Sequence, residues 1–146
     1  MPFDTHSREQ LRRSYVEAWT RRLSCAPLTP LQALIADVIG LHPEYHRLMQ
    51  DADAACAYEP AAGSDTDNPF LHMGLHIAVR EQVSIDRPPG IRALHGALQA
   101  RHGDIHGAEH VLMEALGHTL WQAQRDGRAP DEAQYLARAR RQLTKG

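Results

Sequence analysis

The stretch NPFLHMGLHIAVREQVSIDRPPG, residues 68–90, contains the start, the period and the stop of one helix. Asn68 is a favourable N-cap and Pro69 suits the first helical position, whereas the closing Pro-Pro-Gly does not continue a helix. Between these ends, apolar side chains recur with the spacing of one helix face. His72 and His76 lie on the same apolar stripe, so we expect both imidazoles to face inward.

Similar start and stop signals recur along the chain, and no useful length alternates apolar and polar residues with the period of a strand. In TPLQALIADVIG, residues 29–40, Thr29 and Gln32 are spaced as a capping box and Gly40 is a stop. The segment 51–67, with its Gly, Ser, Asp and Ala residues, is expected to be a loop. The expected helices cover residues 7–24, 30–40, 69–87, 91–102, 105–124 and 131–143, with a short helix starting at Pro43.

These elements predict an all-α protein, a compact antiparallel helical bundle of about five to seven helices. A chain of 146 residues is long enough to bury a substantial core and too short for two ordinary domains. We therefore expect a single helical domain over residues 1–146.

Charge and hydropathy bear on the partners and the location of the chain. Sixteen Lys and Arg residues are nearly balanced by eighteen Asp and Glu residues, which argues against a nucleic acid or an anionic membrane as partner. No apolar run approaches the roughly 20 residues that span a bilayer, and the first residues lack the pattern of a secretion signal. We expect a cytoplasmic protein whose partner is an unidentified small molecule or another protein. A homo-oligomer is among the expected assemblies.

Histidine is the unusual component of the composition. The chain has 10 His residues, and four pairs of them are four residues apart. Shuffling this composition would give fewer than one such pair, so the arrangement calls for an explanation. Side chains four apart stack on one flank of a helix, where two imidazoles can reach one metal ion. The pairs are His42/His46, His72/His76, His102/His106 and His106/His110.

The helix expected over residues 105–124 carries further side chains that bind metals. Its apolar centre is formed by Ile105, Leu112, Leu116 and Leu120. His106 and Glu109 lie on or beside that centre. His110 lies at its edge, and Glu114 turns toward the far side. A carboxylate on such a face is costly unless it is paired with a cation or bound to one.

Imidazole and carboxylate side chains together suit a non-haem divalent metal, with iron and zinc as candidates. The two cysteines, Cys25 and Cys56, do not form the closely spaced cluster that a structural zinc finger or an iron–sulfur cluster uses. We expect the two pairs on the longer helices to converge across a helix–helix interface, around one ion or around two ions bridged by a carboxylate. The candidate metal ligands are His72, His76, His106, Glu109, His110, Glu114, His42 and His46.

Three segments carry a resemblance to a known family. TPLQALIADVIGLHPEYHRLM at 29–49, NPFLHMGLHIAVREQVSIDRPPGIRAL at 68–94 and AEHVLMEALGHTLWQAQRDGRAPDEAQYL at 108–136 resemble the bacterial domain of unknown function 1841 family. The resemblance covers nearly the whole chain. It implies a compact, cytoplasmic bacterial protein and carries no activity with it.

A looser likeness is architectural, to hemerythrin-like and DinB-like metal-binding helical bundles. His72 and His76 match an HxxxH element of such bundles, and His110 and Glu114 match an HxxxE element. The additional ligand histidine of those proteins and the spacing between their elements are not matched. The likeness is therefore a hypothesis about architecture and not about a reaction.

Two functions follow from these patterns. The first is a metal-binding helical-bundle protein with a non-haem His/carboxylate site of unknown reaction, for which iron-dependent oxygen handling and hydrolysis are the candidate chemistries. The alternative is a metal-free helical interaction protein whose histidines pack and hydrogen-bond within the structure. Whether the protein is an enzyme is left open by the sequence.

Overall fold

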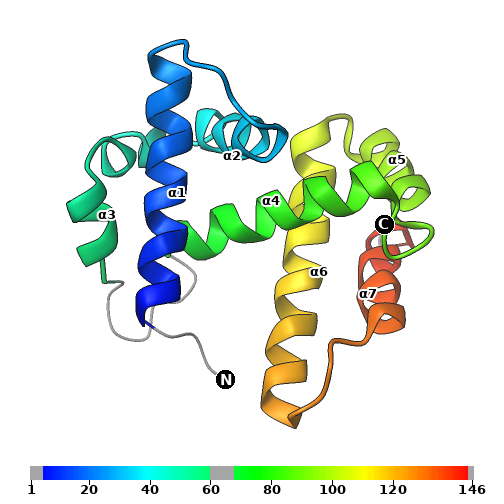
Figure 1. Ribbon diagram of the computed structural model, residues 1–146. Coiled ribbons are helices and arrows are strands. Elements are labelled where there is room, and N and C mark those ends of the chain that lie inside the picture. The colour runs from blue at the N-terminus through cyan, green and yellow to red at the C-terminus, as the bar shows by residue number, and fades with distance from the viewer. Residues whose placement is uncertain (1–4, 60–67, 145–146) are drawn as a thin grey trace. The chain divides into compact units, whose positions relative to one another are not determined.

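A computed structural model describes residues 5–59 and 68–144 of the chain (Figure 1). Within these residues it has seven α-helices, two short 3-10 helices and no strand, which confirms the all-α prediction. The elements are α1 (Thr5–Leu23), α2 (Pro30–Gly40), η1 (Pro43–Tyr45), η2 (Leu48–Gln50), α3 (Ala52–Ala57), α4 (Pro69–Ile85), α5 (Ile91–His102), α6 (Ile105–Asp126) and α7 (Glu132–Thr144).

Helix α2 shows how local chemistry sets a boundary. The Oγ1 atom of Thr29 accepts a hydrogen bond from the Gln32 backbone N–H at 3.1 Å, and Gln32 Oε1 accepts one from the Thr29 N–H at 3.0 Å. This capping box satisfies N–H groups that have no partner in the first turn of a helix. The helix ends at Gly40, as the sequence predicts.

The prediction of a loop over residues 51–67 is wrong for Ala52–Ala57, which form α3. Asp51 caps this short helix, because its Oδ1 atom accepts hydrogen bonds from the N–H groups of Asp53 and Ala54 at 3.0 and 3.2 Å. The part of the expected loop from residue 60 to residue 67 lies outside the described residues.

The chain divides into two compact units, Met1–Gly74 and Leu75–Gly146, and the division point falls within α4. Each unit has its own buried apolar residues. That the whole chain forms a single domain stays a prediction.

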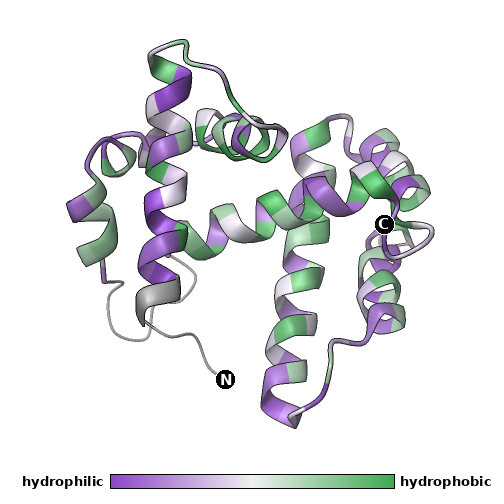
Figure 2. Ribbon diagram, in the orientation of Figure 1, coloured by the Kyte–Doolittle hydropathy of each residue, from purple (hydrophilic) through white to green (hydrophobic). Residues whose placement is uncertain are grey.

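In the first unit, α1 packs against α2, η2 and α3. Tyr15, Ala18 and Trp19 of α1 are buried, as are Val38 and Ile39 of α2. These side chains recur every three or four residues, so each helix presents one apolar face to the core. Figure 2 shows hydrophobic and hydrophilic residues recurring in turn along α1.

In the second unit, α6 packs against α5 and α7, and α5 also packs against α7. The buried core includes Leu112 and Leu116 of α6, as the sequence predicts. The prediction that Ile105 and Leu120 belong to the apolar centre of this helix is wrong, because Ile105 is 47% exposed and Leu120 is 41% exposed. Ile105 is the first residue of α6, where the preceding turn of helix that would cover a side chain is missing.

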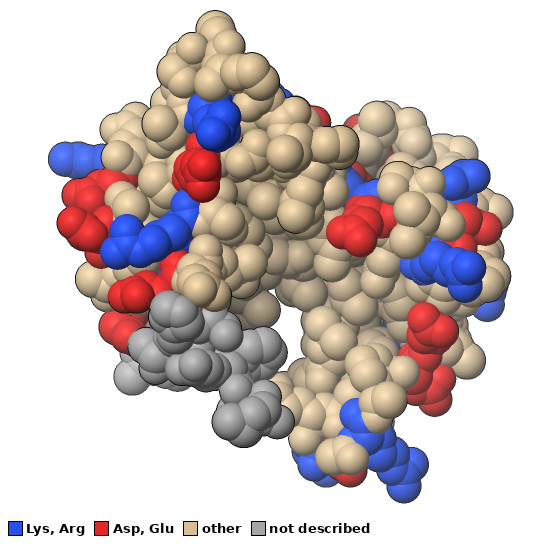
Figure 3. Space-filling view, in the orientation of Figure 1, with Lys and Arg blue, Asp and Glu red and all other residues tan. Residues whose placement is uncertain are grey.

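Surface charge is mixed on the face of the molecule shown in Figure 3, where basic and acidic side chains are interspersed. No described helix combines the length and the hydropathy that a bilayer-spanning segment requires. The expected cytoplasmic location, and the expected lack of nucleic-acid binding, stay predictions.

Candidate metal centre

His42 and His72 form a pair of neighbouring imidazoles in the first unit. His42 precedes η1 and is only 5% exposed, and His72 lies in the first turns of α4. Their ring centroids are 4.7 Å apart, and their planes are nearly perpendicular at 87°. The Tyr45 ring lies 5.4 Å from His42 and 6.2 Å from His72. Two imidazoles from segments far apart in the sequence therefore share one small space.

The third imidazole comes from the same helix as the second. α4 is continuous over Pro69–Ile85, so His76 follows His72 by one turn on the same flank. His76 is fully buried and His72 is partly buried. His42, His72 and His76 each offer a ring nitrogen, and these atoms all lie within 4.8 Å of one another. This group of histidines could hold a metal ion.

A buried carboxylate fixes the orientation of the His76 ring. Within the second unit, His76 Nε2 lies 3.0 Å from Glu109 Oε1. Arg80, one turn further along α4, donates from Nε to Glu109 Oε2 at 2.8 Å and from Nη2 to Oε1 at 3.2 Å. Glu109 is 3% exposed, so the carboxylate is held between an imidazole and a guanidinium away from water.

The charge of Glu109 follows from these contacts. Burial by itself would raise the pKa of the carboxyl, because it disfavours the charged form. Hydrogen bonds from His76 and Arg80, together with their charges, outweigh burial and lower the pKa of Glu109 to about 2. Glu109 is therefore an ionised carboxylate throughout the physiological range of pH.

The other predicted histidines of α6 are more exposed. His106 and His110 lie on the exposed side of the helix, although their rings approach His76. The ring centroids of His76 and His106 are 6.2 Å apart, those of His76 and His110 are 6.3 Å apart, and those of His106 and His110 are 6.1 Å apart. In the described part of the chain, neither joins the group of nitrogens within 4.8 Å. Metal binding by these two residues stays a prediction.

Two further predicted ligands have other surroundings. His46 Nε2 lies 2.8 Å from the Ile39 carbonyl oxygen, and its ring packs 4.4 Å from that of Trp19. The buried backbone oxygen and the indole hold this imidazole in place. Glu114 is exposed on α6 and lines a separate pocket with residues of α7.

The sequence did not identify Arg80 or Glu44 as part of the site. Arg80 lies four residues after His76, so the helical spacing that pairs the histidines also places Arg80 on their flank. Glu44 Oε2 lies 3.4 Å from His42 Nδ1, and the side chain of Glu44 is largely exposed. The Glu44 carboxylate accepts a hydrogen bond from its own backbone N–H and another from His42, and these outweigh burial and lower the pKa of the carboxyl.

Comparison with known families identifies the chain. The sequence pattern of the domain of unknown function DUF1841 matches residues 7–141, which is nearly the whole chain. The chain belongs to the DUF1841 family. All the histidines and acids considered above lie within the matched range. No curated protein and no solved structure matches this DUF1841 protein significantly, so the likeness to hemerythrin-like and DinB-like bundles stays a hypothesis.

Proposed function

We propose that this DUF1841 protein binds a divalent metal ion through His42, His72 and His76. The observation that carries the proposal is the spacing of their ring nitrogens, all within 4.8 Å of one another. Nitrogens that share one tetrahedral ion with bonds of about 2.1 Å lie roughly 3.4 Å apart. Small side-chain rotations therefore suffice to close the three imidazoles around an ion.

The carboxylate behind His76 supports this proposal. Metal-binding histidines commonly donate their second ring N–H to a carboxylate, which fixes the ring and raises its basicity. Glu109 is ionised and lies 3.0 Å from His76 Nε2, so it is suited to this role. A metal at His76 would then be bound through Nδ1, the other ring nitrogen.

The ligand set bears on the class of reaction. Three imidazoles occur in zinc centres that keep a fourth position for water or substrate. Non-haem iron oxygenases instead use two histidines and one carboxylate. The three histidines therefore favour a zinc-type hydrolytic centre over iron-dependent oxygen handling, which is the second candidate.

Elemental analysis of purified, untagged protein tests the proposal. We expect about one equivalent of a divalent metal in the wild type and strongly reduced metal in His42→Ala and His72→Ala, because each change removes one of three ligands. His95→Ala is the control, since His95 lies on α5 and takes no part in the group. Metal content that is the same in all four proteins would contradict the assigned ligands.

One observation favours the alternative, a metal-free interaction protein with structural histidines. Glu109 already gives the buried His76 a hydrogen-bond partner, and Arg80 completes the ion pair. Buried polar groups that are satisfied in this way need no metal. The absence of stoichiometric metal from protein purified without chelators would favour this function.

A further inference from the structure

The second unit contains a pocket whose lining does not include His42, His72 or His76. It lies between α6 and α7 and has a volume of about 270 Å³. Ala115 and Val111 give it an apolar side, and its polar groups come from both helices. Those polar residues are Glu114, His118, Arg138, Arg141 and Gln142.

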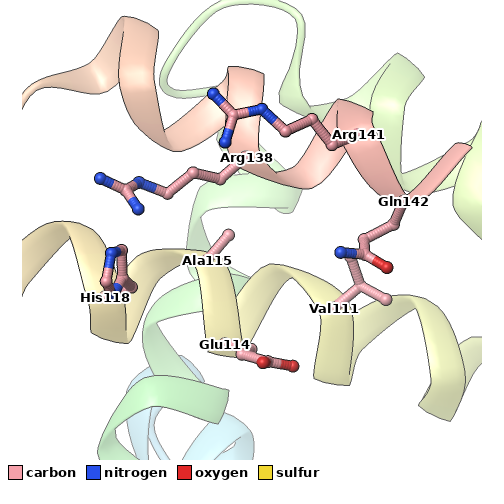
Figure 4. Close-up of a pocket in the computed structure, with 7 residues that line it drawn as sticks. All are labelled: Val111, Glu114, Ala115, His118, Arg138, Arg141 and Gln142. Carbon is pink, nitrogen blue, oxygen red and sulfur yellow. The ribbon is translucent and has the colours of Figure 1, made fainter. Parts of the chain in front are cut away.

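The two arginines make the α7 side of the pocket basic. Arg138 and Arg141 are three residues apart, so they lie on the same face of α7. Figure 4 shows both guanidinium groups reaching in the same direction from α7, with His118 on the facing helix and Glu114 pointing away from them. Among the described residues, neither arginine forms an ion pair with a carboxylate. Two permanent positive charges therefore face the pocket and exceed the single negative charge of Glu114, the carboxylate among its lining residues.

One nitrogen of the Arg138 guanidinium is hydrogen-bonded within the protein, and another is not. Its Nη2 atom donates a hydrogen bond to Gln122 Oε1 on α6, which fixes the position of the guanidinium. Its Nε atom is buried and has no hydrogen-bond partner in the described structure. A buried N–H group without an acceptor is unfavourable, so an anion with several oxygens would satisfy a donor that the protein leaves unused.

The neighbourhood of His118 adds a further donor on the opposite side. The His118 ring stacks on that of Trp121, with centroids 5.8 Å apart, and Arg125 lies 5.5 Å above the Trp121 ring. These contacts hold an imidazole at the edge of the pocket. Gln142 supplies amide donors, and Glu114 can accept hydrogen bonds from hydroxyl groups.

We propose that the pocket between α6 and α7 binds a small phosphate monoester, with its phosphate held by Arg138 and Arg141. Guanidinium groups match phosphate oxygens with paired hydrogen bonds, which a single lysine ammonium does not reproduce. The volume admits a phosphate with a short polar substituent. That substituent, with its hydroxyl groups, would lie toward Gln142 and Glu114.

Isothermal titration of the full chain with glycerol 3-phosphate at low salt tests the proposal. We expect saturable binding with one site per chain, and weaker binding of inorganic phosphate, which lacks the hydroxyl-bearing part. Arg141→Ala should weaken binding by about tenfold or more, because it removes a charged, forked donor. Arg141 is exposed, so this variant is expected to fold even if Arg138→Ala does not.

Arg140→Ala is the matched control, since it removes the same charge from the same helix but lies outside the pocket. An equal loss of affinity in Arg140→Ala and Arg141→Ala would mean general attraction of anions and would overturn the proposal. Equal affinity for glycerol 3-phosphate and malate would overturn the preference for phosphate. No detectable binding to the wild type would overturn the site itself. Binding should persist after treatment with a chelator, so its outcome is distinguishable from that of the proposed metal centre.

Discussion

Glu109 is the buried carboxylate that His76 and Arg80 both contact in the second unit. A carboxylate that is 3% exposed would be strongly unfavourable by itself, yet contacts with His76 and Arg80 keep it charged. Removing one partner of such a group is costly because the other partner stays buried and charged. Protonation of the Glu109 carboxylate in acid should have a similar effect, because it removes the negative charge that His76 and Arg80 contact.

The depressed pKa of Glu109 predicts a loss of stability in acid. Its pKa falls from the ordinary value of 4.5 to about 2 on folding, so the ionised form stabilises the native state above pH 4.5. That contribution, on the order of 3 kcal/mol, is lost as the pH falls from about 4.5 through about 2. Glu109→Gln should remove this dependence, so its free energy of unfolding should change less steeply with pH in this range.

Urea unfolding of the wild type and Glu109→Gln at several pH values between about 5 and 2.5 measures the difference in slope. Glu109→Gln should be less stable than the wild type near pH 5, and this difference should shrink as the pH falls toward 2.5. Glu132→Gln, at an exposed carboxylate in the first turn of α7, should keep the slope of the wild type. Equal slopes for wild type and Glu109→Gln would contradict the assigned pKa.

The sequence predicted part of this residue-scale picture. The phase of Glu109 beside an apolar stripe indicated that the carboxylate needs a cation. Which cation it would find depends on how α4 and α6 pack within the second unit, and helical periodicity does not encode that. His42 and His72 show the same limit, because their segments are 30 residues apart and only tertiary packing brings the rings to 4.7 Å.

At the scale of elements, α3 is a helix that its neighbours hold in place. It has 6 residues, and an isolated helix of that length is unstable in water. Arg12 of α1 is buried and donates from Nη1 to the carbonyl oxygens of Ala55 at 3.0 Å and Tyr58 at 2.8 Å. Its guanidinium also lies 4.3 Å from the centre of the Phe70 ring. The sequence favoured a loop here because these contacts come from distant residues.

Arg12→Met tests the dependence of α3 on α1. Methionine keeps an unbranched apolar stem but leaves the carbonyl groups at the end of α3 without their charged donor, so we expect a loss of about 2 kcal/mol in the free energy of unfolding. Arg13→Met is the control, because Arg13 is exposed and its only described contact is a 3.5 Å ion pair with Asp53. Such a pair contributes less than about 1 kcal/mol. Urea denaturation followed by circular dichroism measures both, and similar losses would show that α3 does not depend on Arg12.

At the scale of the whole molecule, local patterns in the sequence predicted the helical class and most of the boundaries. N-cap residues, prolines in first turns and glycines after last turns act within a few residues of the element that they delimit, which is why α2 was placed correctly. The division of contacts at Gly74 and Leu75 was not predicted, because α4 continues through that point with an uninterrupted helical pattern. Long-range pairing, and not local propensity, decides which histidines become neighbours.

If a metal is bound, the stability of the whole chain should depend on it. A ligand that binds only the native state at 100 times its dissociation constant stabilises that state by about 2.7 kcal/mol. For a chain of this length, that corresponds to a rise of about 5 to 10 °C in the melting temperature. We expect the melting temperature of the wild type to fall by this amount with a strong chelator and to recover with one particular divalent ion.

His72→Ala should respond to neither treatment, whereas His95→Ala should respond as the wild type does. The response to chelator is the decisive measurement, because His76→Ala destabilises the protein in either case by leaving Glu109 without one of its partners. A wild-type melting temperature that is indifferent to chelator, in protein without stoichiometric metal, would mean that the three imidazoles serve the structure alone.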